Sequence, residues 1–164
     1  MKSLSILLAF SGLATLVAVF GVGCRRSADK TEIAPVPKHE HHPPHGGTAV
    51  VLGAEAYHLE LVRDATTGAL QVYVLDGEME DFIRISAPSM IIDAVVNNAP
   101  QLLGLRPVAT TATGETVGDT ALFEGQAEWL KTAGNFDATL RSITIRGTTF
   151  TDVKFNFPQG NDHE

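Results

Sequence analysis

Four of the six histidines in this chain of 164 residues lie close together, in a short segment rich in proline. The four are His39, His41, His42 and His45. Imidazole is the commonest protein ligand for Zn²⁺, Cu²⁺ and Ni²⁺, and its charge changes between about pH 5 and 8. The pattern therefore fits three roles: capture of a divalent transition metal, pH sensing, or a soluble spacer whose affinity for metal is incidental.

A fifth histidine, His58, stands two residues before Glu60 in a segment that alternates between polar and apolar residues. In an extended strand, residues two apart point to the same face, with their Cα atoms roughly 6.6 to 6.8 Å apart. If the proline-rich segment folds back, His45, His58 and Glu60 form a set of two imidazoles and one carboxylate, which suits Zn²⁺ or another divalent ion. The alternative is a solvent-facing polar strand surface with an incidental ion pair.

Motifs of the common enzyme classes are absent from the sequence. It contains no G-x-S-x-G elbow, no P-loop, no dinucleotide fingerprint, no CxxC and no HExxH. The formal net charge of −7 also argues against a nucleic-acid binder, because affinity for phosphate is built from Lys and Arg. The sequence predicts a protein that is not an enzyme and does not bind nucleic acid.

Four carboxylates fall within the six residues from Asp76 to Asp81. Hard cations such as Ca²⁺ bind oxygen ligands of this kind, but the order of the residues differs from that of an EF-hand loop. We interpret the run as the tip of a hairpin, where its charge repels neighbouring molecules and keeps the protein soluble.

The first 23 residues have the composition of a secretion signal. Lys2 provides a positive charge, and the run from 4 to 20 is apolar and uncharged. The sequence G-V-G-C at residues 21–24 resembles the lipobox of bacterial lipoproteins, in which the cysteine is lipidated. Cys24 is the only cysteine in the chain and has no internal disulfide partner, which lipidation of its sulfur explains.

We therefore expect a lipoprotein that is anchored to a membrane through Cys24, on the periplasmic or extracellular side of the cell envelope. An uncleaved membrane-spanning helix and an ordinary secreted protein are the alternatives, and all three place the domain outside the cytoplasm. Residues 24–45 contain four prolines and little apolar periodicity, which predicts an extended His/Pro-rich tether.

The remainder of the chain has the pattern of β-strands. Alternating or β-branched apolar segments recur at intervals of about 8 to 15 residues, with Gly and Asn between them. These segments are 48–52, 56–63, 69–75, 82–85, 90–96, 102–109, 121–126, 136–146 and 149–157. The spacing predicts an all-β domain over 46–158, an antiparallel Ig-like sandwich of seven to eight strands, followed by a flexible tail at 159–164. At most one short helix is expected, within 124–132, where Trp129 caps one end of the core.

A short pattern near the start of this domain resembles a known group of proteins. It consists of Pro44–Gly47 (PHGG), Tyr57–Val62 (YHLELV) and Val72–Asp76 (VYVLD). The pattern is similar to one in small, uncharacterised bacterial envelope lipoproteins, including those of planctomycetes. Its His-Gly-Gly opening is similar to that of periplasmic adaptor subunits of heavy-metal efflux pumps. The resemblance implies a compact β domain associated with metal handling, and it implies no catalytic residues.

Two functions are open at this stage. In the first, a membrane-anchored lipoprotein binds or buffers Zn²⁺, Cu²⁺ or Ni²⁺ through the histidine-rich tether, with His45, His58 and Glu60 as the best structured set of ligands. In the second, the domain is an envelope interaction module that binds another protein and has no functional metal.

Overall fold

The computed structural model describes residues 42–162. The predicted signal peptide (1–23) and the predicted lipidation site Cys24 lie outside the described residues. So do His39 and His41 of the predicted tether, and residues 163 and 164. No helix within 42–162 combines the length and the apolar character needed to cross a membrane.

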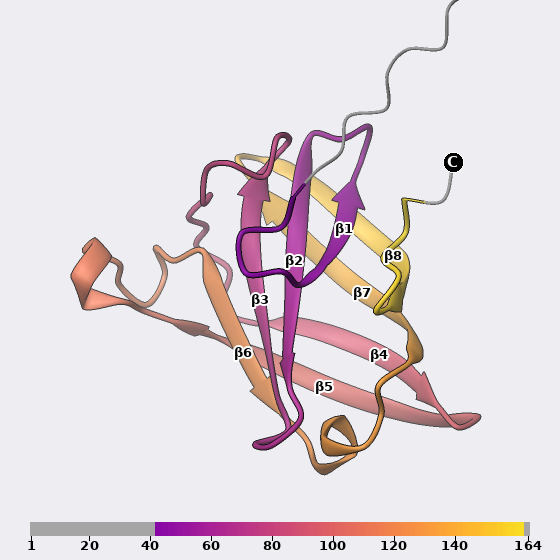
Figure 1. Ribbon diagram of the computed structural model, residues 1–164. Coiled ribbons are helices and arrows are strands. Elements are labelled where there is room, and N and C mark those ends of the chain that lie inside the picture. The colour runs from indigo at the N-terminus through magenta and orange to yellow at the C-terminus, as the bar shows by residue number, and fades with distance from the viewer. Residues whose placement is uncertain (1–41, 163–164) are drawn as a thin grey trace, which may run out of the picture. The chain divides into compact units, whose positions relative to one another are not determined.

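Residues 42–162 form eight strands and two short 3₁₀ turns. The strands are β1 (Thr48–Leu52), β2 (Tyr57–Asp64), β3 (Ala69–Asp76), β4 (Met90–Val96), β5 (Ala99–Val108), β6 (Leu122–Gln126), β7 (Phe136–Ile145) and β8 (Thr148–Phe157); the turns are η1 (Thr111–Thr113) and η2 (Glu128–Lys131). Every pair of neighbouring strands is antiparallel, and all lie in one sheet with the order β1-β2-β3-β6-β5-β4-β7-β8 (Figure 1). The predicted all-β class, with its antiparallel strands, is confirmed.

The sheet curls until its two ends nearly meet, so the architecture is closer to a barrel than to the expected Ig-like sandwich. Strand β5 pairs with β4 along 99–105 and with β6 along 106–108, which joins the two halves of the molecule into one sheet. At the other side β1 approaches β8, and Thr48 Oγ1 donates a hydrogen bond to the Pro158 carbonyl oxygen (3.2 Å) just after β8. A sandwich would instead divide the strands between two separate layers.

The apolar side chains of alternate strand residues fill the inside of the curled sheet, including the buried Leu59 and Leu61 of β2. Trp129 meets Phe136 edge to face, with ring centroids 5.1 Å apart, and packs against the core as predicted. The helix expected within 124–132 is limited to the 3₁₀ turn η2, because residues 122–126 pair with β3 as strand β6.

The C-terminal segment closes the outer edge of β1. The Asn161 side chain accepts a hydrogen bond from Val51 N (2.7 Å) and donates one to the Val51 carbonyl oxygen (3.1 Å). Its amide thus makes the two hydrogen bonds that a paired residue of a neighbouring strand would make. Gly160 and Asn156 exchange two backbone hydrogen bonds (2.9 and 2.7 Å). Residues 160 and 161 thus belong to the fold, whereas we expected a flexible tail from residue 159. A side-chain amide can bond to the backbone groups at the edge of a strand, and a segment that does so needs no alternation of apolar residues. The sequence pattern therefore gave no sign that residues 160 and 161 belong to the fold.

Candidate functional site

A tight turn brings the start of the described chain over the outer face of β2, the face turned away from the core. Gly46 N donates a hydrogen bond to the Pro43 carbonyl oxygen (2.9 Å), with Pro44 and His45 as the central residues of the turn. Pro44 suits the second position of a β-turn because its φ is fixed. At Gly47, a Cβ atom would lie 2.6 Å from the Leu61 carbonyl oxygen, so the chain passes too close to β2 for any side chain.

Glu60 is the residue that holds this turn in place. It lies on the outer face of β2 and is nevertheless fully buried. Its Oε1 accepts hydrogen bonds from the backbone nitrogens of His45 (2.7 Å) and Gly47 (2.9 Å), and its Oε2 contacts His45 Nδ1 (2.8 Å). Three donors from the turn therefore compensate for the loss of water around the carboxylate.

Two aromatic rings fix the plane of the His45 ring. His45 stacks on Tyr73 of β3, with ring centroids 4.0 Å apart and planes inclined by 18°. Phe82 lies against both rings, at 5.8 Å from each. The His45 side chain keeps 38% of its surface exposed, so the ring is held from one side and open to solvent on the other.

Polar groups continue from Tyr73 across the outer face. The Tyr73 hydroxyl donates to Gln71 Oε1 (3.1 Å), and Gln71 Nε2 donates to Glu124 Oε2 (2.9 Å) on β6. Partial burial raises the pKa of Tyr73, and the nearby carboxylates of Glu60 and Glu124 raise it further. The surroundings of His45 are thus rich in negative charge, which favours a cation.

The structure brings together two members of the predicted ligand set. His45 and Glu60 are in direct contact, whereas His58 is buried on the same face, with its Nδ1 3.3 Å from the Asp76 carbonyl oxygen. Within residues 42–162, no three His, Cys, Asp or Glu side chains are placed so that together they could hold a metal ion. His42 is exposed at the start of the described chain.

The acidic run forms a folded loop that follows β3. Asp76 Oδ1 accepts hydrogen bonds from the backbone nitrogens of Glu80 (2.9 Å) and Asp81 (3.2 Å). Met79 is buried outside the main core cluster, and Phe82 joins the rings around His45. The run therefore leads directly into an apolar side chain that lies over the outer face, a feature beyond the role in solubility that we predicted for its charges.

Sequence reasoning missed Tyr73 and Phe82 as members of the site. Tyr73 pairs with Glu60 across β2 and β3, and residues paired in this way point to the same face. The alternation of β3 places Tyr73 on the polar face, so the correct strand register would have identified it. Phe82 had no such signal, because we predicted a strand at 82–85 and the chain there forms only isolated bridges.

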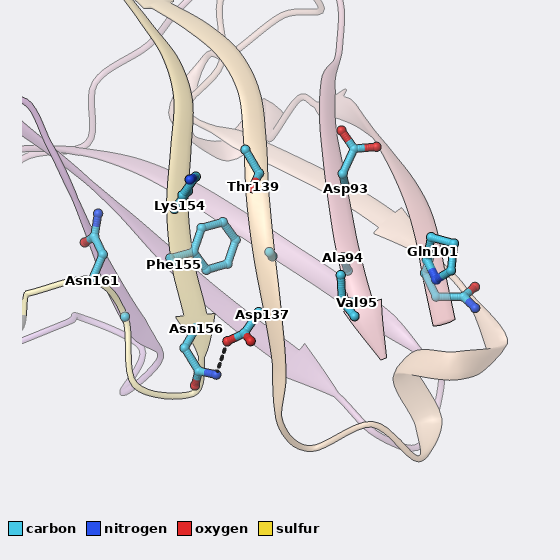
Figure 2. A pocket seen from close by; sticks show the side chains of 13 residues that line it. Asp93, Ala94, Val95, Gln101, Asp137, Thr139, Lys154, Phe155, Asn156 and Asn161 are labelled. Carbon is cyan, nitrogen blue, oxygen red and sulfur yellow. Dashed lines mark hydrogen bonds between the residues drawn. The ribbon is translucent and has the colours of Figure 1, made fainter. Parts of the chain in front are cut away.

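A second region with polar side chains is an open pocket of about 570 Å³ over β4, β7 and β8 (Figure 2). In it, Asn156 Nδ2 donates a hydrogen bond to Asp137 Oδ1 (2.8 Å). Asn156 Oδ1 is buried and has no hydrogen-bond partner among residues 42–162, so it offers an acceptor to a polar group. No histidine lines this pocket, which separates it from the site around His45.

Comparison with family models, curated proteins and solved structures finds no match for this chain. Function is therefore inferred from geometry and chemistry alone.

Proposed function

We propose that this protein is a membrane-anchored lipoprotein of the cell envelope that binds Zn²⁺, Cu²⁺ or Ni²⁺, with His45 as the ligand fixed to the folded domain. The supporting observation is the buried carboxylate of Glu60, 2.8 Å from His45 Nδ1. Metal-binding histidines commonly donate the hydrogen of their second ring nitrogen to a carboxylate, which fixes the tautomer and orients the ring. Glu60 stands in that relation to His45.

The contact gives the two ring nitrogens of His45 different roles. In the proposed arrangement Nδ1 donates its hydrogen to Glu60 Oε2, which leaves the lone pair of the ring on Nε2. Among residues 42–162, no side chain contacts Nε2 by a hydrogen bond. In this proposal Glu60 is a positioning residue, Nε2 of His45 binds the metal, and His58 lies outside the site. This revises the set of His45, His58 and Glu60 expected from the sequence.

The other ligands come from the tether. His42 precedes His45 by three residues, and His41 and His39 precede it by four and six. One fixed imidazole and two or three from the adjacent chain supply the nitrogen ligands that Zn²⁺, Cu²⁺ and Ni²⁺ accept. Each further ligand must become ordered when the metal binds, so metal binding would hold the tether against the domain.

The proposed anchor sets how far the site can reach. Cys24 precedes His45 by 21 residues, which span at most about 70 Å when fully extended. Lipid on Cys24 would therefore keep His45 within that distance of the membrane while leaving the domain in the aqueous phase. Such an arrangement suits capture of ions close to the membrane surface.

Zinc binding by the full chain in detergent tests the proposal, measured by competition with a chromophoric chelator of known affinity. We expect one site per chain, with affinity reduced at least tenfold in His45→Ala and in the triple variant His39→Ala/His41→Ala/His42→Ala. His163→Ala is the matched control, because it removes one histidine far from the tract in sequence. Equal affinity in all four proteins would refute metal binding by this site.

The role of Glu60 requires a readout beyond affinity, because Glu60→Gln also alters the packing of the turn. The ¹⁵N chemical shifts of the His45 ring report which nitrogen carries the hydrogen. We expect the Nδ1–H tautomer in the native protein, a change at Nε2 on adding Zn²⁺, and a mixture of tautomers in Glu60→Gln. A change at Nδ1 on adding Zn²⁺ would contradict the assignment of Glu60 as a positioning residue.

Anchoring is tested separately through Cys24. We expect the native protein to begin at Cys24, to carry lipid by mass spectrometry and to partition with membranes. Cys24→Ser should block processing and leave a longer chain without lipid. An unchanged mass and unchanged partition in Cys24→Ser would refute the lipid anchor without affecting the metal proposal.

A further inference from the structure

The first half of strand β5 has a neighbouring strand on one side only. Residues 99–105 pair with β4, whereas the pairing with β6 covers only 106–108. Figure 1 shows β5 running beside β4 before it reaches β6. Within residues 42–162, no strand pairs with the second edge of β5 between 99 and 104.

The position of a proline shows which backbone groups face this open edge. Pro107 pairs with β6 but has no N–H, so the hydrogen bonds of that ladder are made by Arg106 and Val108 on either side of it. Backbone groups of successive residues alternate between the two edges of a strand. Counting back by twos from Arg106, the groups of Gly104 and Leu102 face the open edge.

Two further observations agree with this assignment. A Cβ atom on Gly125 of β6 would lie 2.6 Å from the Gly104 carbonyl oxygen, which is therefore directed toward β6 and away from β4. By the same alternation Pro100 faces the open edge, where its missing N–H breaks no bond to β4. The open edge thus presents two donors, Leu102 N and Gly104 N, and the carbonyl oxygens of Pro100 and Leu102.

We infer that this edge pairs with the same edge of a second copy of the chain, antiparallel and about a two-fold axis at Leu102. In this register Leu102 faces Leu102 of the second copy, and each donates its N–H to the other's carbonyl oxygen. Gly104 faces Pro100 of the second copy and donates to its carbonyl oxygen. The pair of edges makes four hydrogen bonds, and every N–H on the open edge has an acceptor.

The side chains fit the same register. Leu102 and Val95 are 58% and 51% exposed and lie on the outer face of β5 and β4. Two copies would therefore bring the two Leu102 side chains together at the seam, with a Val95 one strand away on either side. Residues paired across the seam point to the same face, which places each Pro100 ring opposite a Gly104. Only Ile91 Cδ1 lies within 4 Å of a Cβ built on Gly104, so there is space for the ring.

The observations favour a second copy over a strand from another protein. The donor that Pro100 lacks would have met the Gly104 carbonyl oxygen, and that oxygen is already directed at Gly125. A two-fold axis at Leu102 therefore places the missing donor of Pro100 opposite the carbonyl oxygen of Gly104, the one acceptor on this edge that lies against Gly125. Interfaces about a two-fold axis use the same patch on both subunits, as this edge does.

Sedimentation equilibrium of the full chain in density-matched detergent tests the inference. We expect a reversible monomer–dimer equilibrium, weakened at least tenfold by Leu102→Pro, which is about 1.4 kcal/mol of association free energy. Because Leu102 N does not bond to β4, this substitution removes donors from the seam only. Leu102→Val retains the N–H and should keep most of the dimer. Val117→Ser, at another exposed apolar residue, should leave the equilibrium unchanged.

The outcomes separate the occupants of the edge. A monomer at all concentrations would overturn the inference, and so would a dimer that Leu102→Pro does not weaken. If Leu102→Pro lowers the thermal midpoint of the monomer, hydrogen exchange decides: Leu102 N should be protected in a concentration-dependent manner in the native chain. Rapid exchange at high concentration would overturn the inference. Neither result depends on metal binding, so this test is independent of the proposed function.

Discussion

The outer faces of the two halves of the sheet differ in a way that reverses the usual distribution of polarity. On β2 and β3, the outer face carries Glu60 and His58, and both are fully buried. On β4 and β5, the outer face carries Val95 and Leu102, and both are exposed. The first face is covered by the turn at 43–47 and by the loop after β3; the second is bare within residues 42–162.

The difference shows that the chain covers the face on which its polar side chains require partners. A buried carboxylate is costly unless it is hydrogen-bonded, so the turn that supplies three donors to Glu60 is strongly held there. Val95 and Leu102 have no such requirement, and covering them gains only hydrophobic free energy that a second molecule can supply. Substitutions on the covered face should therefore cost the most stability.

The largest effect is expected from Glu60→Ala. The variant leaves His45 N, His45 Nδ1 and Gly47 N without their acceptor, and hydrogen bonds to charged groups contribute about 1.5 to 3 kcal/mol each. Since removing the carboxylate also removes its desolvation cost, we expect a net loss of about 3 kcal/mol in the free energy of unfolding, measured by urea denaturation. The control Glu124→Ala removes one bond to Gln71 and should cost about 1 kcal/mol or less. Equal losses would contradict the special role of the covered face.

A smaller effect is expected where the turn touches β2. Gly47→Ala places a Cβ atom 2.6 Å from the Leu61 carbonyl oxygen and should cost about 2 kcal/mol, while displacing the His45 ring from Tyr73. The matched control is Gly46→Ala, which meets no atom within 4 Å but has a φ of +67°. It should cost only about 1 kcal/mol. Urea denaturation measures both losses, and ring-current shifts report the stacking. A lower cost for Gly47→Ala than for Gly46→Ala would show that the turn is not packed on β2.

Asn161→Ala tests the closed edge of β1 against the open edge of β5. It removes two neutral hydrogen bonds to Val51 and should cost about 1.5 kcal/mol in urea denaturation, with faster amide exchange at Val51 N. Gln126→Ala is the control, because its exposed amide makes one bond, to the Thr67 carbonyl oxygen. No change in exchange at Val51 would show that Asn161 does not seal this edge.

The smallest effect is expected on the bare face, from the pH dependence of Asp93. Its hydrogen bonds from Arg141 (2.7 and 2.8 Å) lower its pKa below the ordinary value of 3.8. A depressed pKa in the folded state gives stability that is present above that ordinary value and is lost as the pH falls through the lowered pKa. We expect Asp93→Asn to flatten the stability profile below about pH 4 and to change little at pH 7. An Asp93 pKa at or above its ordinary value, measured by NMR titration, would contradict the ion pair.

Most strands were predictable from the sequence because each has one face in the core, which imposes the alternation that the sequence displays. The sequence could not distinguish a sandwich from a barrel, because the difference depends on the pairing of β5 with both β4 and β6. We also predicted that this strand begins at residue 102, because Pro100 is typical of a turn. The contact of His45 with Glu60 was anticipated as a ligand set. The hydrogen bonding of a buried Glu60 to the turn was not anticipated, because the burial of Glu60 depends on the close approach of Gly47 to β2.

The seal between Asn161 and Val51 also sets an order of assembly. It joins residues separated by 110 positions. The outer edge of β1 therefore gains its hydrogen bonds from Asn161 only after nearly the whole domain has been synthesised and has folded around it. Until then one edge of β1 lacks this partner, and β1 is held by its pairing with β2, which in turn pairs with β3.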